Sequence, residues 1–167
     1  MKAFGNIVID LTKPLANKGE SFAFCGDFSL QSDVLPYPNA QLEKVSVDFS
    51  VVFTSPNVSV SGKIACFVCG SCDRCLEKVS KQFVLSFNQT FLKDQADDGE
   101  SYCYSGSKLD VTKAVQDEIV LSLPTLLLCK EDCKGLCPKC GANRNTTDCG
   151  CNTQKENAFS ALLNLKF

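Results

Sequence analysis

Six of the twelve cysteines in this 167-residue chain fall within 23 residues, between Cys129 and Cys151. The chain contains no histidine, which excludes Ser–His and Cys–His nucleophile pairs and mixed Cys/His zinc sites. The first residues lack the basic region and apolar run of a signal peptide, and no run of about 20 apolar residues could cross a membrane. We therefore expect a cytoplasmic protein whose thiols stay reduced and serve metal or redox chemistry rather than disulfides.

The strongest single motif is CPKCG at residues 137–141. Two thiolates at Cys-x-x-Cys spacing can bind one metal ion from one tight turn, for which Pro138 presets the backbone and Gly141 lets it curl. A Cys-Gly-Cys pair follows after an eight-residue loop. The two pairs predict a closed, tetrahedral zinc site with four thiolate ligands: Cys137, Cys140, Cys149 and Cys151.

Two further cysteine pairs each supply half of a metal site. Cys72 and Cys75 lie in the sequence CDRC, and Cys129 and Cys133 lie in CKEDC. Because a structural zinc ion needs four ligands, we predict that these pairs complete each other, so that the chain holds one or two structural Zn²⁺ ions. The alternative is that Cys72 and Cys75 are small apolar residues of a turn.

Two redox interpretations of the cysteine motifs are alternatives to structural zinc. The spacing Cys-x2-Cys-x2-Cys-x2-Cys approaches an iron–sulfur ligand run and involves Cys66, Cys69, Cys72 and Cys75. However, Cys66 and Cys69 are an odd number of residues apart in an expected strand, so their side chains point to opposite faces. A thiol oxidoreductase using CPKC or CDRC is the other reading, because nearby cations lower a thiol pKa. Neither motif has a thioredoxin-like strand–helix context.

Basic side chains lie in or beside the expected metal loops. They can offset the negative charge of a four-thiolate site, and they could also contact phosphate: Arg74, Lys134, Lys139 and Arg144. The net charge of −2 gives no basic excess for bulk binding to nucleic acid, so any RNA contact must come from a local patch. Closed thiolate shells leave no open metal position, so we expect neither an enzyme nor a small-molecule substrate.

Alternating apolar and polar residues predict strands over most of the first hundred residues. We expect strands at residues 3–11, 21–28 and 81–92, a hairpin at residues 45–68 around the turn SPN, and a short strand at residues 102–104. The segment from Leu109 reads as a helix that Asp110 caps and Pro124 ends. TQKE at residues 153–156 matches a capping box and predicts a short terminal helix.

These elements predict an α+β fold. In residues 1–125, a mostly antiparallel, curled sheet carries one long helix. In residues 126–167, a Cys-rich, zinc-bound module ends in the short terminal helix and packs on the first part. A fold of this size buries roughly 70% of its unfolded surface, so an ordinary hydrophobic core is possible as well.

The turn CDRCLE (72–77) and the run DEIVLSLPTLLLCKEDCKGLCPKCGANRN…CGC resemble the YceD family, the large ribosomal RNA subunit accumulation proteins of bacteria and plastids. The resemblance begins at about residue 45, and Arg144 departs from it because the family more often carries leucine there. It implies a ribosome-biogenesis factor that promotes accumulation of large-subunit ribosomal RNA. The implied partner is pre-ribosomal RNA or a large-subunit ribosomal protein, with no membrane contact.

Overall fold

The computed structural model describes residues 5–29, 35–37, 39–94 and 101–151. Its elements are β1 (Val8–Asp10), α1 (Thr12–Ala16), β2 (Ser21–Phe28), β3 (Gln41–Thr54), β4 (Asn57–Ser71), β5 (Lys78–Lys93), β6 (Cys103–Tyr104), β7 (Lys108–Asp110) and α2 (Thr112–Ser122). The fold is α+β with mostly antiparallel strands and few helices. Neither described helix is long and apolar enough to cross a membrane. The terminal helix expected after residue 153 lies outside the described residues.

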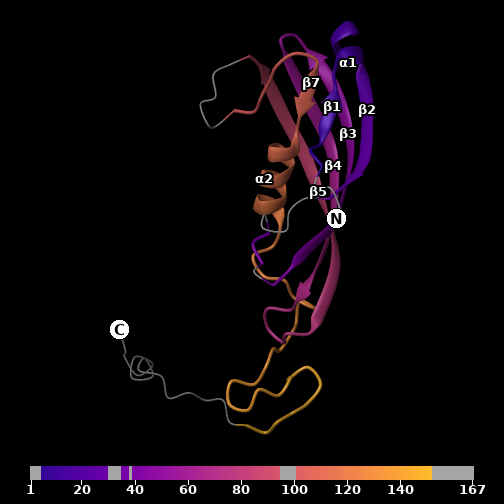
Figure 1. The fold of residues 1–167 in the computed structure, drawn as a ribbon. Helices are drawn as coiled ribbons and strands as arrows, with labels where there is room; N and C mark the ends of the chain where they lie inside the picture. The colour runs from indigo at the N-terminus through magenta and orange to yellow at the C-terminus, as the bar shows by residue number, and fades with distance from the viewer. Residues whose placement is uncertain (1–4, 30–34, 38, 95–100, 152–167) are drawn as a thin grey trace, which may run out of the picture.

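The main sheet has the strand order β2-β3-β4-β5-β6, and only β6 pairs in parallel. The expected hairpin is confirmed, because Thr54 pairs with Asn57 across the SPN turn and β3 and β4 stay paired over almost their whole length. Figure 1 shows β2 to β5 as one tall sheet with α2 on one side. The sheet thus forms a long scaffold whose lower end is the β4–β5 turn.

The hydrophobic core lies between the main sheet and the elements that cover its inner face. Residues along β3 alternate between buried and more exposed positions, as the sequence predicted. The rings of Phe49 and Phe87 stack within this core with centroids 4.7 Å apart. Helix α2 contributes three of its buried side chains to the same core, namely Ala114, Val115 and Ile119.

A second, two-stranded sheet pairs β1 with β7, and Ile9 faces Leu109 in it. Each strand is followed by a short helix, and the sequences IDLTKPL and LDVTKAV at these two junctions repeat one pattern. In both copies the aspartate accepts the backbone N–H of the threonine two residues later, at 2.8 Å from Asp10 and 2.9 Å from Asp110. Within the described residues, the strand expected at residues 3–11 is shorter: β1 covers only Val8–Asp10, the residues that pair with β7.

The helix predicted before Pro124 is α2, and it is short rather than long. It has 11 residues, and its first helical residue is Thr112, whose N–H the Asp110 carboxylate accepts from just outside the helix. At the other end, Leu123 adopts an extended conformation (φ −72°, ψ 144°), as residues before proline prefer. The long helix is thus not confirmed within the described part of the chain.

Candidate metal centres

The structure gathers eight cysteines into two groups of four. In each group the ligand-capable sulfur atoms lie within 4.8 Å of one another. We call one the inner cluster (Cys72, Cys75, Cys129 and Cys133) and the other the outer cluster (Cys137, Cys140, Cys149 and Cys151). These groups contain the same residues as the two sets predicted from spacing, and either could hold a metal ion.

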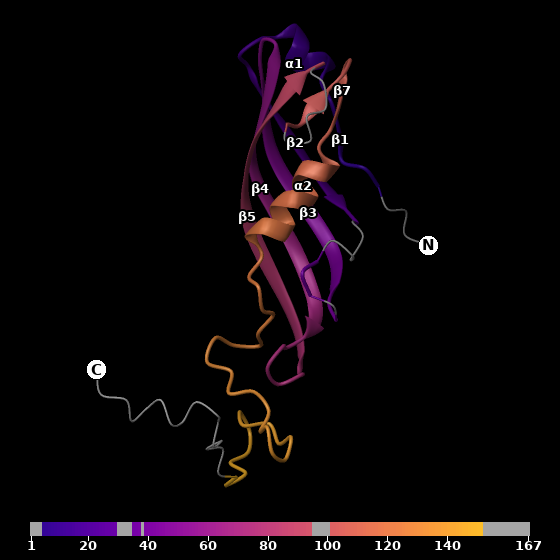
Figure 2. The same cartoon turned by 90° about the vertical axis from the view of Figure 1, so that its left-hand side faces the viewer.

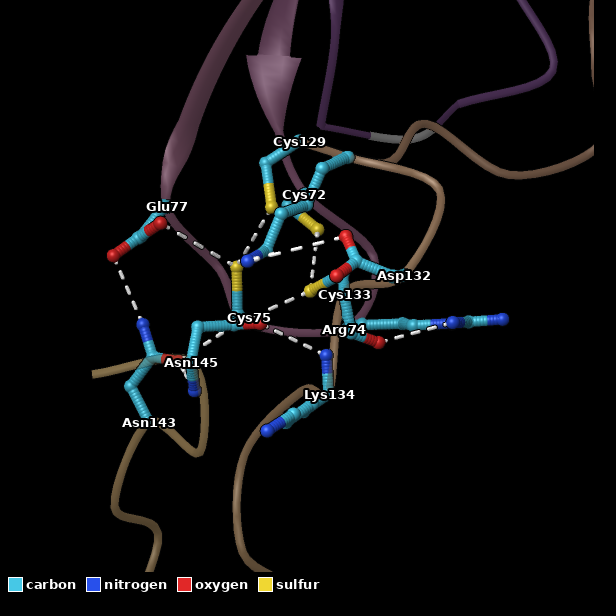
Figure 3. A network of polar contacts seen from close by, with 11 residues as sticks. Cys72, Arg74, Cys75, Glu77, Cys129, Asp132, Cys133, Lys134, Asn143 and Asn145 are labelled. Atoms are coloured by element: carbon cyan, nitrogen blue, oxygen red, sulfur yellow. Dashed lines mark hydrogen bonds and ion pairs between the residues drawn. The ribbon is translucent and has the colours of Figure 1, made fainter. Parts of the chain in front are cut away.

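The spacing of the inner sulfur atoms fits a tetrahedral ion. The Cys72 and Cys133 Sγ atoms are 3.8 Å apart, and those of Cys75 and Cys129 are 3.6 Å apart (Figure 3). Four sulfurs at about 2.3 Å from one tetrahedral centre lie roughly 3.8 Å from each other. A disulfide would bring the sulfurs to about 2.05 Å. The distances therefore suit shared metal coordination and not sulfur–sulfur bonding.

The β4–β5 turn presents the first two inner cysteines. The backbone N–H of Leu76 donates to the Cys72 carbonyl at 2.9 Å, and Leu76 takes a positive φ of 61° to close the turn. The segment after α2 is held against this turn by a reciprocal pair of hydrogen bonds. The Asp73 N–H donates to the Leu127 carbonyl at 2.9 Å, and the Leu127 N–H donates to the Asp73 carboxylate at 2.6 Å. These two hydrogen bonds hold Leu127 beside the turn and so place Cys129, two residues later, in the cluster.

The two clusters are joined through Arg74 and Gly135. The Arg74 guanidinium donates to the Cys133 carbonyl at 3.0 Å, and the Arg74 carbonyl accepts the Leu136 N–H at 3.0 Å. Gly135 sits so close to Arg74 that an added Cβ would lie 3.0 Å from the Arg74 carbonyl oxygen. The Cys-rich segment, residues 129–151, thus docks onto the CDRC turn by contacts with the Arg74 backbone and side chain. Figures 1 and 2 show it beyond the lower end of the sheet.

The outer cluster forms around a second tight turn. The Gly141 N–H donates to the Cys137 carbonyl at 2.8 Å, and Gly141 takes a φ of +74°. The Cys137 N–H in turn donates to the Ala142 carbonyl at 2.8 Å. Cys137 is buried, but Cys140 is exposed, whereas three of the four inner cysteines are buried. An ion in the outer cluster would therefore be more open to solvent.

Hydrogen bonds from backbone amides lower the pKa of one cysteine in each cluster, and neighbouring thiols raise the pKa of another. Burial raises the pKa of Cys72, but backbone amides that donate to its sulfur bring it down to about 6. A backbone hydrogen bond at Glu77 lowers the pKa of Cys75, yet burial and three neighbouring thiols raise it to about 12. In the outer cluster, amides lower the pKa of Cys137 to about 6, and adjacent thiols raise that of Cys151 to about 12.

Two asparagines support the inner cluster, and the spacing of the cysteines did not reveal them. The Asn145 side-chain amide donates to the Cys133 sulfur at 3.3 Å and to the Asn143 side-chain oxygen at 2.8 Å. Asn143 donates to the Glu77 carboxylate at 2.9 Å, next to the CDRC turn (Figure 3). The usable signal was the Asn-Arg-Asn run directly after a cysteine turn, since asparagine amides often bond nearby backbone in loops.

Cys66 and Cys69, the other two cysteines of the possible iron–sulfur ligand run, belong to neither cluster. Cys66 is fully buried on the inner face of β4, and the Cys69 thiol donates to the Ser80 hydroxyl at 3.0 Å. Cys25 and Cys103 also stay outside the clusters among the described residues. The four-cysteine run within β4 and its turn is therefore divided between two environments.

The four basic residues singled out from the sequence have different surroundings. Arg74 is engaged with the Cys133 carbonyl. Lys134 and Arg144 line one polar pocket, and Lys139 is exposed and outside that lining. The cations therefore do not form one patch.

Gly135 and Gly141 offer a matched test of the docking contact. Both have a positive φ, which costs an alanine about 1–2 kcal/mol, but only Gly135 meets the Arg74 carbonyl, because nothing lies within 4 Å of a Cβ on Gly141. We expect Gly135→Ala to lower the free energy of unfolding by about 1 kcal/mol more than Gly141→Ala does. Denaturant unfolding of the metal-loaded variants measures the difference, and equal losses would show that the approach to Arg74 is not limiting.

Comparison with known proteins gives one consistent result. Residues 60–166 match the profile of the family described as "Large ribosomal RNA subunit accumulation protein YceD". The chain is 25% identical to large ribosomal RNA subunit accumulation protein YCED homolog 1, chloroplastic, from Arabidopsis thaliana, over 80% of this chain and 51% of that protein. It is 28% identical to an uncharacterized protein of Mycobacterium tuberculosis, over 58% of this chain and 50% of that protein.

The match to the Zea mays YCED homolog 1 is shorter, with 36% identity over 40% of this chain and 23% of that protein. The chain spans about half the length, or less, of the curated relatives it matches. No solved structure matches it.

Proposed function

Because the chain belongs to the YceD family of large ribosomal RNA subunit accumulation proteins, we propose that it is a ribosome-biogenesis factor that raises the level of large-subunit ribosomal RNA. Its direct partner in this proposal is pre-ribosomal RNA or a large-subunit ribosomal protein. The observation that carries the proposal is the family match over residues 60–166. The cysteine clusters lie inside the matched region, so they belong to the part of the chain that this function concerns.

The metal in this proposal is structural zinc, one ion in each cluster. All eight ligand atoms are sulfur, and soft thiolate ligands select zinc or iron over magnesium and calcium. Four thiolates complete a tetrahedral shell and leave no position for a water or a substrate. An ion in the inner cluster would fasten the Cys-rich segment to the β4–β5 turn, and an ion in the outer cluster would close the loop after Cys140. The protein acts here by binding and not by catalysis.

Elemental analysis of protein purified without added metal tests the metal assignment. Two zinc ions per chain are expected, together with a colourless solution. Bound iron with visible absorption would instead support the redox alternative, in which the Cys-x-x-Cys pairs hold an iron–sulfur centre. About one zinc per chain would leave only one of the two clusters as a site.

Depletion of the protein tests the function. Cells that lack it are expected to show a lower ratio of large-subunit to small-subunit ribosomal RNA, and the wild-type chain should restore that ratio. The Cys25→Ser chain should restore it equally well, because Cys25 is exposed and lies outside both clusters. An unchanged ratio in depleted cells would reject the proposed function.

A further inference from the structure

A polar pocket of about 290 Å³ lies in the Cys-rich segment. One wall is Lys134, which sits in the short connection between Cys133 of the inner cluster and Cys137 of the outer cluster. The other wall is the loop that the outer cluster closes, and it contributes Arg144, Asn145, Thr146, Thr147 and Asp148. Both walls are therefore attached at their ends to the proposed metal ligands.

Hydrogen bonds hold the two walls at a set distance. The Asn145 side-chain oxygen accepts the Lys134 N–H at 2.9 Å, while its amide nitrogen donates to the Cys133 sulfur at 3.3 Å. The Arg144 N–H donates to the Gly135 carbonyl at 2.9 Å. The pocket is thus built by the same contacts that support the inner cluster.

The two cations of the pocket have no carboxylate partner within the described residues. The ion pairs found there are Lys44–Asp27 and Lys130–Asp132. The Lys134 side chain runs away from the labelled cluster sulfurs in Figure 3. The acid of the pocket, Asp148, accepts the Gly150 N–H at 3.1 Å. Two cations against one carboxylate give the residues that line the pocket a formal excess of one positive charge.

We propose that this pocket binds a phosphate group of the RNA backbone, an inference that rests on the proposed function and specifies its contact. An arginine guanidinium and a lysine ammonium are the usual cationic partners of phosphate, and the hydroxyl of Thr147 adds a donor, whereas that of Thr146 already donates to the Asn143 carbonyl at 3.2 Å. The lining contains no aromatic side chain on which a base could stack. The contact would therefore position RNA without reading its sequence.

Binding of two short RNA duplexes of unrelated sequence to the zinc-loaded full chain tests this proposal, with affinity measured against salt concentration. We expect Lys134→Ala and Arg144→Ala each to weaken binding about tenfold, equally for both duplexes. Each should also reduce the slope of log affinity against log salt by about 0.9. Lys139→Ala is the matched control, because it removes an exposed cation of the same segment from outside the pocket, and it should change neither quantity. Zinc content and unfolding midpoint of each variant check that the segment is intact.

Several results would overturn the proposal. Equal losses from Lys139→Ala would show a diffuse electrostatic attraction and no pocket. Binding of a phosphoserine peptide or of inorganic phosphate that depends on Arg144, without binding of RNA, would assign the pocket to another ligand. The outcome is separable from that of the proposed function: if the Lys134→Ala/Arg144→Ala chain fully restores ribosomal RNA in depleted cells, the pocket inference falls and the function stands.

Discussion

Replacing Cys72 with serine is expected to release one metal ion per chain and to lower the free energy of unfolding by about 5 kcal/mol or more. Cys72 is fully buried and belongs to the cluster that joins the β4–β5 turn to the segment after α2. Structural zinc contributes about 10–16 kcal/mol in isolated zinc-finger peptides, which is comparable with the whole stability of a domain. Loss of this ion therefore removes a crosslink between parts of the chain that are far apart in sequence.

The effect should be largest in the Cys-rich segment. Hydrogen exchange is expected to show lost protection from Cys129 to Cys151 in the Cys72→Ser chain, while the centre of the main sheet keeps much of its protection. Cys140→Ser should release one ion as well but cost less stability, because Cys140 is exposed and the outer cluster closes a local loop. Cys25→Ser, outside both clusters, should change neither metal content nor protection. Unchanged metal content in the Cys72→Ser chain would remove the inner cluster as a metal site.

Gly62→Ala is expected to destabilise the main sheet by about 3 kcal/mol or more, the upper range for overpacking a core. In the strand register Gly62 pairs with Phe49 of β3 on one side and with Phe87 of β5 on the other. The two rings stack over this position with centroids 4.7 Å apart. A Cβ on Gly62 would lie 2.0 Å from the Asp48 carbonyl oxygen and 2.9 Å from the Phe49 Cα. Because both contacts are backbone atoms, only a shift of the paired strands could relieve them.

Gly26→Ala is the matched control for this change. Gly26 also lies in a strand of the main sheet, and its added Cβ would meet the Phe28 ring at 2.8 Å. That contact is with the end of a half-buried side chain, which can rotate away at small cost. Denaturant unfolding of both variants compares the two positions. Similar losses of stability would show that the approach of β3 to Gly62 does not limit packing of the sheet.

The strands of the main sheet were predictable because their burial follows a local rule. Apolar residues alternate along β3 and β4, and a sheet with one covered face demands that alternation. The β1–β7 sheet was less accessible, because three-residue strands carry little periodic signal and pair residues about a hundred positions apart. The helix expected between Asp110 and Pro124 is shorter than predicted, because α2 begins only at Thr112 and Leu123, before the proline, is already extended.

The supporting side chains of the metal centres depended on contacts that spacing does not encode. Asn145 reaches the Cys133 sulfur, and Glu77 meets Asn143 across 66 positions of sequence. Polar residues in cysteine-rich loops usually bond nearby backbone, so the sequence offered no preference for these particular partners. The division into residues 1–125 and 126–167 and the cytoplasmic location stay predictions.

By itself the sequence determined the local half-sites, because Cys-x-x-Cys, Cys-x3-Cys and Cys-x-Cys keep two sulfurs close in the chain whatever the rest of the fold does. It also determined that any metal shell would be built from thiolates, since no histidine exists. Only the tertiary structure decided which half-sites meet. The hydrogen bond from the Leu127 N–H to Asp73 spans 54 positions, and it exists only after the sheet has brought the β4–β5 turn to the end of α2. Pairing of distant segments is a property of the packed core: the need for four ligands suggested which half-sites could combine, but the contacts that bring them together are not encoded in residue spacing.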